Sequence, residues 1–106
     1  MKAVIAGEDS DGLGEALETE GVELTRIEGF ADRETLESAG IGSADVFVLT
    51  ETVHATGIPV ARELNESVKI VVYAGDSLPE FAQPLADLKV DPALLEPAAV
   101  AEELAR

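Results

Sequence analysis

The sequence contains no cysteine and one histidine among its 106 residues. The absence of thiols excludes disulfides, thiolate zinc sites, iron–sulfur clusters and a cysteine nucleophile. A single histidine excludes a histidine-rich metal site, and we expect His54 to be a surface residue at the start of a helix rather than a general base. The motifs G-x-S-x-G and G-x-x-x-x-G-K-[ST] are also absent, so the sequence predicts no catalytic residue.

Long apolar runs are absent as well. No run approaches the roughly 18 to 20 residues that cross a bilayer, and the apolar stretch 3–7 is too short for the core of a signal peptide. A chain of 106 residues has room for one domain, which we expect to span residues 1–106. We therefore expect a single cytoplasmic domain with no membrane partner.

Basic residues are scarce, with 7 Lys and Arg against 22 Asp and Glu and a formal net charge of -15. Nucleic acids and anionic lipids bind basic stripes, and the few basic residues here are scattered singly, so both partners are excluded. A domain this acidic repels itself in dilute buffer unless concentrated salt screens its charges, and in this composition the chain resembles haloarchaeal cytoplasmic proteins. The alternative, an acidic protein with a cationic partner, more often gathers its acids in one block, and no run of five like charges occurs.

Short apolar runs alternate with amphipathic stretches along the whole chain, which is typical of a parallel sheet with helical crossovers. The expected strands are residues 2–6, 22–27, 45–50, 68–74 and 86–90. The expected helices are residues 12–20, 32–40, 55–64 and 97–106, with a short helical turn at 79–83. Asp91 and Glu96 each precede a proline, which predicts a helix cap followed by the first helical residue. In the last helix, Val100 and Leu104 form an apolar seam that faces either the sheet or a second copy of the chain.

Five segments carry a resemblance to a known family, namely residues 32–41, 44–50, 61–65, 68–74 and 86–92. Over these segments the chain resembles the N-terminal Rossmann-like domain of potassium-channel and transporter regulators, the TrkA-N or RCK family, most specifically in residues 36–50. The resemblance implies a domain that forms dimers and binds dinucleotides or adenine nucleotides at the C-terminal ends of its strands. That family has one more strand before its match to residues 32–41, and removing this outermost strand from the order 3-2-1-4-5-6 leaves 2-1-3-4-5. We therefore predict an α/β fold with a single five-stranded parallel sheet in the order 2-1-3-4-5 and helices on both faces, a Rossmann-like or flavodoxin-like three-layer sandwich.

The resemblance places the candidate nucleotide-binding residues at the strand ends. They are Gly7, Gly12, Gly14, Thr50 and Ala74. The family's spacing G-x-G-x-x-G is replaced here by a turn that contains Glu8, Asp9 and Asp11, and these three acids oppose a pyrophosphate. We therefore assign no cofactor and no metal. The favoured function is a non-catalytic regulatory or interaction module of a halophilic cytoplasm, with weak residual nucleotide binding and a homodimer as expectations.

Receiver domains of response regulators share the order 2-1-3-4-5 and carry an acidic pair after the first strand, where this chain has Glu8 and Asp9. The receiver mechanism also uses an aspartate at the end of the third strand, which accepts phosphate, and a lysine after the fifth. This chain offers Thr50-Glu51 and Lys89 at those places. The alternative function is therefore a receiver-like signalling module, with a divalent-cation site built from Glu8, Asp9 and Glu51.

An enzyme that acts on a small nucleotide is a third alternative. The chain resembles small haloarchaeal proteins that carry the label CTP synthetase. That activity needs a phosphate-binding ligase core and a cysteine glutaminase, and 106 residues without cysteine provide neither. The enzyme ranks last because no residue pattern names a catalytic group.

Overall fold

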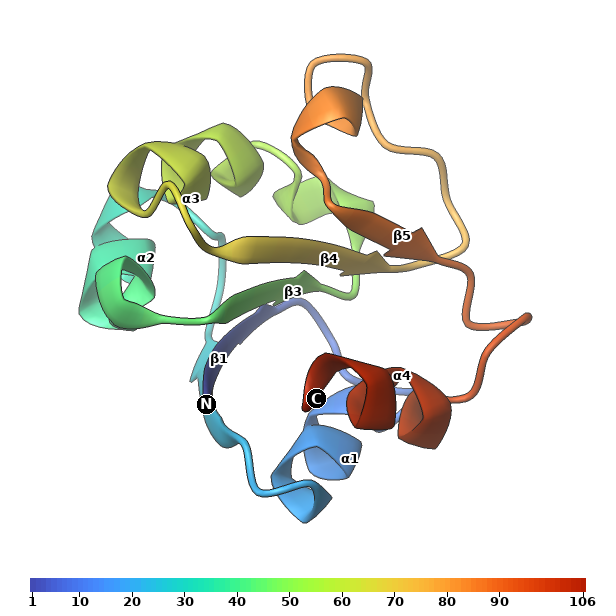
Figure 1. Ribbon diagram of the computed structural model, residues 1–106. Coiled ribbons are helices and arrows are strands. Elements are labelled where there is room, and N and C mark those ends of the chain that lie inside the picture. Colours follow the sequence, from blue (N-terminus) through green and yellow to red (C-terminus); the bar gives the residue numbers. More distant parts are fainter.

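The computed structural model describes all residues from Met1 to Arg106 and contains one parallel sheet of five strands. The strand order is β2-β1-β3-β4-β5, as predicted from the sequence (Figure 1). The strands are β1 Lys2–Ala6, β2 Glu23–Ile27, β3 Val46–Leu49, β4 Lys69–Tyr73 and β5 Leu88–Val90. Because all five run in the same direction, the segments that follow them gather along one edge of the sheet.

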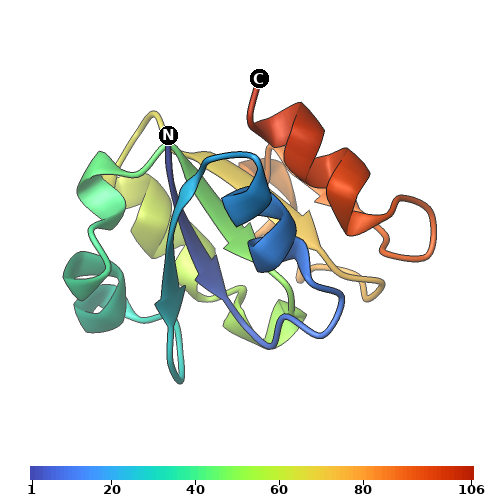
Figure 2. The same cartoon turned by 90° about the horizontal axis from the view of Figure 1, so that it is seen from below.

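Helices cover both faces of the sheet, so the predicted flavodoxin-like three-layer arrangement is confirmed (Figure 2). One face carries α1 Leu13–Thr19 and α4 Pro97–Leu104, which contact each other, and the other carries α2 Arg33–Ser38 and α3 Gly57–Leu64. Short 3-10 turns complete the connections at Ile41–Ser43, Thr52–His54 and Gln83–Leu85. None of these helices has the length and apolar character that a membrane crossing requires.

The central strands are apolar on both faces because each face packs against its own helical layer. In β3, Phe47 and Leu49 belong to the cluster under α2 and α3, whereas Val46 and Val48 belong to the cluster under α1 and α4. All four side chains are buried. This arrangement explains why residues 45–50 read as a continuous apolar run rather than as an alternating one.

The start of α2 follows the expectation for a capped helix. The Asp32 carboxylate accepts the backbone N–H of Thr35 at 2.9 Å, and the Thr35 hydroxyl accepts the backbone N–H of Asp32 at 2.9 Å. The hydrogen bond from the Thr35 backbone lowers the pKa of Asp32. Asp32 therefore fixes where the helix begins, as a capping box does elsewhere.

Two sequence-based expectations in the last third of the chain are corrected. Asp91-Pro92 does not begin a helix, because the Asp91 carboxylate accepts the backbone N–H of Ala93 at 2.9 Å and closes a turn instead. The helical turn expected at 79–83 lies at Gln83–Leu85. The connection between β4 and β5 therefore contains no α-helix.

The apolar residues of α4 belong to the core of their own subunit. Val100 and Leu104 are buried against the layer that also contains Leu13 and Leu17 of α1. The interpretation of Val100 and Leu104 as a seam between two copies of the chain is therefore wrong, since α1 and the sheet already cover them. Any homodimer has to use other residues.

Candidate functional site

The ends of β1 and β3 lie in close contact. Gly7 has a φ of +105°, and a Cβ atom there would collide with the Thr50 hydroxyl. The Thr50 hydroxyl donates to the Ala6 carbonyl at 3.3 Å, and the backbone N–H of Glu8 donates to Glu51 Oε1 at 2.9 Å. Gly7 is therefore required by the approach of two strand ends, independently of any ligand.

Asp9 is held by groups of the protein itself. Its Oδ2 accepts the backbone N–H of Gly14 at 2.8 Å and lies 3.1 Å from Arg26 Nη1. The Asp9 side chain is 10% exposed, and its second oxygen is buried without a partner. A Cβ on Gly14 would lie 2.6 Å from both the Arg26 and Asp9 side chains, so Gly14 leaves room for this ion pair.

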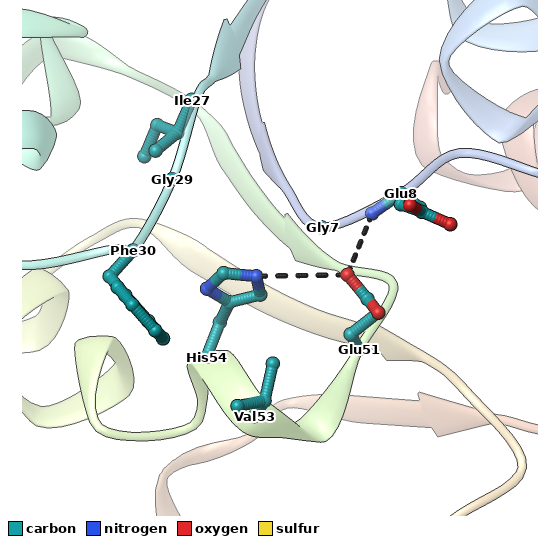
Figure 3. Close-up of a pocket in the computed structure, with 8 residues that line it drawn as sticks. All are labelled: Gly7, Glu8, Ile27, Gly29, Phe30, Glu51, Val53 and His54. Carbon is teal, nitrogen blue, oxygen red and sulfur yellow. Dashed lines mark hydrogen bonds and ion pairs between the residues drawn. The ribbon is translucent and has the colours of Figure 1, made fainter.

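A pocket of about 450 Å³ opens between the ends of β1, β2 and β3 (Figure 3). Gly7, Glu8 and Glu51 line it on the side of β1 and β3. The rest of its wall consists of the exposed side chains of Phe30 and Val53 together with Ile27, Gly29 and His54. The eight lining residues include one phenyl ring, one imidazole and two glutamates, and they include neither lysine nor arginine.

His54 lies within this pocket and is 5% exposed, so the expectation of a surface residue is wrong. The 3-10 turn Thr52–His54 brings its imidazole between Phe30 and Glu51, as Figure 3 shows. Nε2 lies 3.8 Å from Glu51 Oε1, the ring centroid lies 6.0 Å from that of Phe30, and Nδ1 has no hydrogen-bond partner.

A second pocket of about 270 Å³ brings together two of the candidate nucleotide-binding residues, Thr50 and Ala74. Its wall also contains Asp11, Glu51 and Asp76, which make it acidic. Gly7 lines the neighbouring 450 Å³ pocket instead, while Gly12 and Gly14 line neither. Gly12, with a φ of +81°, precedes the first residue of α1. The five candidates therefore do not form one site.

Tyr73, which also lines this second pocket, is a core residue whose hydroxyl donates to the Leu95 carbonyl at 2.7 Å. Burial raises the pKa of Tyr73, and the negative charges of Asp11 and Glu96 add to the effect. Through its hydrogen bond to Leu95 the hydroxyl holds the segment that leads into α4.

The carboxylates of Glu8, Asp9 and Glu51 do not converge on one point. No group of three or more His, Asp or Glu side chains is arranged to hold a metal ion. Asp9 faces Arg26, and Glu51 accepts from the Glu8 backbone. Lys89, which corresponds to the lysine of receivers in the sequence comparison, is also engaged within the protein. Its ammonium donates to the Ala74 carbonyl at 2.9 Å.

Sequence reasoning missed Arg26 and Phe30 and misplaced His54. Arg26 meets Asp9 because β1 pairs with β2 in a register that sets Ile5 opposite Arg26, and this register is not fixed by the sequence pattern. The sequence did contain one signal for Phe30: a large aromatic residue in the short polar segment after the second strand. The residues around Phe30 show no amphipathic pattern that would have placed its side chain in the core.

A model of the family of unknown function DUF7126 matches residues 3–104. The chain belongs to this family. No curated protein matches the DUF7126 chain. Among solved structures, it is similar to HP1043, an orphan response regulator of H. pylori, with a TM-score of 0.73 and 17% identity over 100% of this chain and 97% of that one.

Two further solved structures are similar to the DUF7126 domain. A candidate pilus assembly protein (cpaE) of Burkholderia thailandensis has a TM-score of 0.69 and 18% identity, over 98% of this chain and 94% of that one. A candidate pilus assembly-related protein of Burkholderia pseudomallei has a TM-score of 0.65 and 16% identity, over 99% and 89%. At these identities the likeness shows the flavodoxin-like fold, and it supports the resemblance to the TrkA-N family only at the level of a Rossmann-like fold.

Proposed function

We propose that this DUF7126 domain is a receiver-like regulatory module that works through non-covalent contacts, without phosphorylation. The observation that carries the proposal is the end of β3, where a receiver has its phosphate-accepting aspartate. This chain has Thr50-Glu51 after β3 and no aspartate there; the Thr50 hydroxyl donates to the Ala6 carbonyl, and Glu51 Oε1 accepts the Glu8 backbone N–H. A threonine hydroxyl cannot form the acyl phosphate that an aspartate forms.

Two other groups that phosphoryl transfer would use, Asp9 and Lys89, are engaged within the protein. Asp9 Oδ2 pairs with Arg26 at 3.1 Å, and this positive charge opposes the binding of a divalent cation to the same carboxylate. Lys89 donates to the Ala74 carbonyl rather than standing free. The alternative of a divalent-cation site at Glu8, Asp9 and Glu51 therefore has no support in the geometry.

Exposed apolar side chains favour a contact surface at the same edge of the sheet. Six large apolar residues are exposed in the whole protein. Four of them, Phe30, Val53, Leu94 and Leu95, lie in the segments that follow β2, β3 and β5. They form two separate groups, since Phe30 and Val53 line one pocket and Leu94 and Leu95 line another. Exposed apolar patches often mark interaction sites. A module that binds a protein partner, or a second copy of itself, would use this edge.

Weak nucleotide binding, the expectation drawn from the TrkA-N resemblance, is a less favoured proposal. Thr50 and Ala74 do share a pocket, but Asp11, Glu51 and Asp76 in its wall would repel phosphate groups. We expect NAD or NADH to bind with a dissociation constant above ~0.1 mM. This limit corresponds to a binding free energy of about 5.5 kcal/mol in magnitude. Calorimetry in concentrated salt tests this expectation, and micromolar affinity would restore the nucleotide hypothesis.

The proposed function is tested by incubating the protein with acetyl phosphate and magnesium chloride and measuring its intact mass. A phosphorylatable receiver domain in the same tube serves as the control. We expect a phosphoryl adduct on the control and none on the DUF7126 chain. An alkali-labile adduct on the chain would overturn the proposal.

A further inference from the structure

We propose that the pocket between the ends of β1, β2 and β3 binds a guanidinium group, the planar cation that arginine carries. This inference does not depend on the receiver-like function, because it rests on the chemistry of the pocket alone. The pocket combines an exposed aromatic face, the Glu51 carboxylate and a buried imidazole nitrogen without a partner, and Glu8 adds a second negative charge nearby.

The imidazole of His54 offers a buried acceptor for a ligand. Its Nε2 faces Glu51 Oε1 at 3.8 Å, and this negative charge favours the proton on Nε2. Nδ1 is then an acceptor; it lies on the Phe30 side of the ring in Figure 3 and has no hydrogen-bond partner. A buried acceptor without a partner costs free energy, and a ligand that brings an N–H donor removes that cost.

The carboxylates add further acceptors and negative charge. Glu51 Oε1 already accepts the Glu8 backbone N–H at 2.9 Å, so this side chain is held in place while Oε2 is left to accept from a ligand. Glu8 also lines the pocket, but its side chain points away from His54 and Phe30 in Figure 3, so its carboxylate adds negative charge near the pocket and no direct contact. A pocket whose side chains offer acceptors selects a ligand rich in donors, and a guanidinium group has five N–H donors in one plane.

The apolar wall fits the flat face of such a cation. Phe30 is 69% exposed and Val53 is 60% exposed, so the Phe30 ring can turn aside from His54 without disturbing the core. Guanidinium groups stack on aromatic faces through cation–π attraction, more readily than the strongly hydrated ammonium of lysine. The same carboxylates repel phosphate groups, so a nucleotide fits this pocket less well.

The test is a titration of the 15N-labelled protein with Nα-acetyl-arginine amide at constant ionic strength, followed by NMR. His54 is the only histidine in the sequence, so its imidazole 15N signals identify themselves. We expect saturable binding with a dissociation constant of about 1 to 10 mM, an affinity typical of a few such contacts, and a shift of the His54 Nδ1 signal. The citrulline amide, which replaces the guanidinium by neutral urea, should bind at least about fivefold more weakly.

Variants locate the site. Glu51→Gln keeps an acceptor for the Glu8 N–H but removes the charge, and Phe30→Ala removes the exposed ring; each should weaken arginine amide binding by about fivefold. Phe81→Ala is the matched control, because Phe81 is 51% exposed and lies outside the pocket. Circular dichroism of each variant checks that the fold is intact.

Three results would overturn the proposal. The first is an absence of saturable shifts with arginine amide at up to about 50 mM. The second is equal binding of the arginine and citrulline amides, which would show that the charge is not recognised. The third is displacement of arginine amide by adenosine monophosphate with shifts at His54, which would assign the pocket to nucleotides.

Discussion

Arg26 Nη1 lies 3.1 Å from Asp9 Oδ2, and the same oxygen accepts the backbone N–H of Gly14 at 2.8 Å. Through these two contacts Asp9 joins the turn after β1 to the end of β2 and to the first turn of α1. A carboxylate that would be a cation ligand in a receiver thus has a structural role here.

The Asp9–Arg26 pair should contribute measurably to stability. Arg26→Ala leaves the nearly buried Asp9 carboxylate without its cation, so we expect the free energy of unfolding to fall by about 1 to 2 kcal/mol. Arg33→Ala is the control, because its pair with Glu63 is exposed at both ends and should contribute about 0 to 0.5 kcal/mol. Urea unfolding at one fixed salt concentration measures both. Equal losses would mean that Asp9 gains nothing from its burial beside Arg26.

Alanine substitutions at Gly7 and Gly12 distinguish backbone strain from steric crowding. Both have positive φ values, so alanine at either position costs about 1 to 2 kcal/mol of strain. A Cβ at Gly12 meets nothing within 4 Å, whereas at Gly7 it meets Thr50 and Glu51. We expect Gly7→Ala to destabilise the fold by at least about 1 kcal/mol more than Gly12→Ala in thermal unfolding. Equal effects would contradict the close contact of the β1 and β3 ends.

Val100 distinguishes a core helix from an interface helix. Val100→Asp places a charge in the layer between α4 and α1, so we expect a loss of about 3 kcal/mol or more and loss of the folded circular dichroism spectrum. Ala99→Asp on the exposed side of the same helix should leave the fold intact. A Val100→Asp protein that keeps its fold but changes its mass in light scattering would return α4 to a dimer interface.

Salt should stabilise the protein strongly. The net charge is -15, so the acidic side chains repel one another at low ionic strength. About 1 M salt shortens the screening length to ~3 Å. We expect the melting temperature to rise by more than about 10 °C between about 0.1 M and 2 M potassium chloride. A melting temperature that does not change with salt would contradict the proposal of a halophilic protein.

The sequence predicted the layers of this fold better than its surface. The apolar runs of β1, β3 and β4 and the cap at Asp32 are local signals, and each gave its element within one or two residues. Asp91 forms a similar local signal but closes a turn, because its carboxylate accepts the N–H of Ala93. A proline after an acidic residue is compatible with both outcomes.

The site was harder to predict because its contacts cross between strands. The Asp9–Arg26 pair depends on the register of β1 against β2, and the burial of His54 depends on a 3-10 turn that follows β3. Neither feature has a periodic signature. The strand-end glycines were visible in the sequence, but Gly7 and Gly14 accommodate protein atoms, which a motif alone cannot distinguish from room for a phosphate.

In the proposed function, contacts within the protein occupy the strand ends, which take no part in phosphoryl chemistry. The most direct test is an amide NMR titration with magnesium chloride at constant ionic strength, followed by addition of acetyl phosphate. We expect no saturable shift at Glu8, Asp9 or Glu51 and no further change with the phosphoryl donor. Saturable magnesium shifts at these three amides, followed by a second set of shifts with acetyl phosphate, would contradict the proposed function.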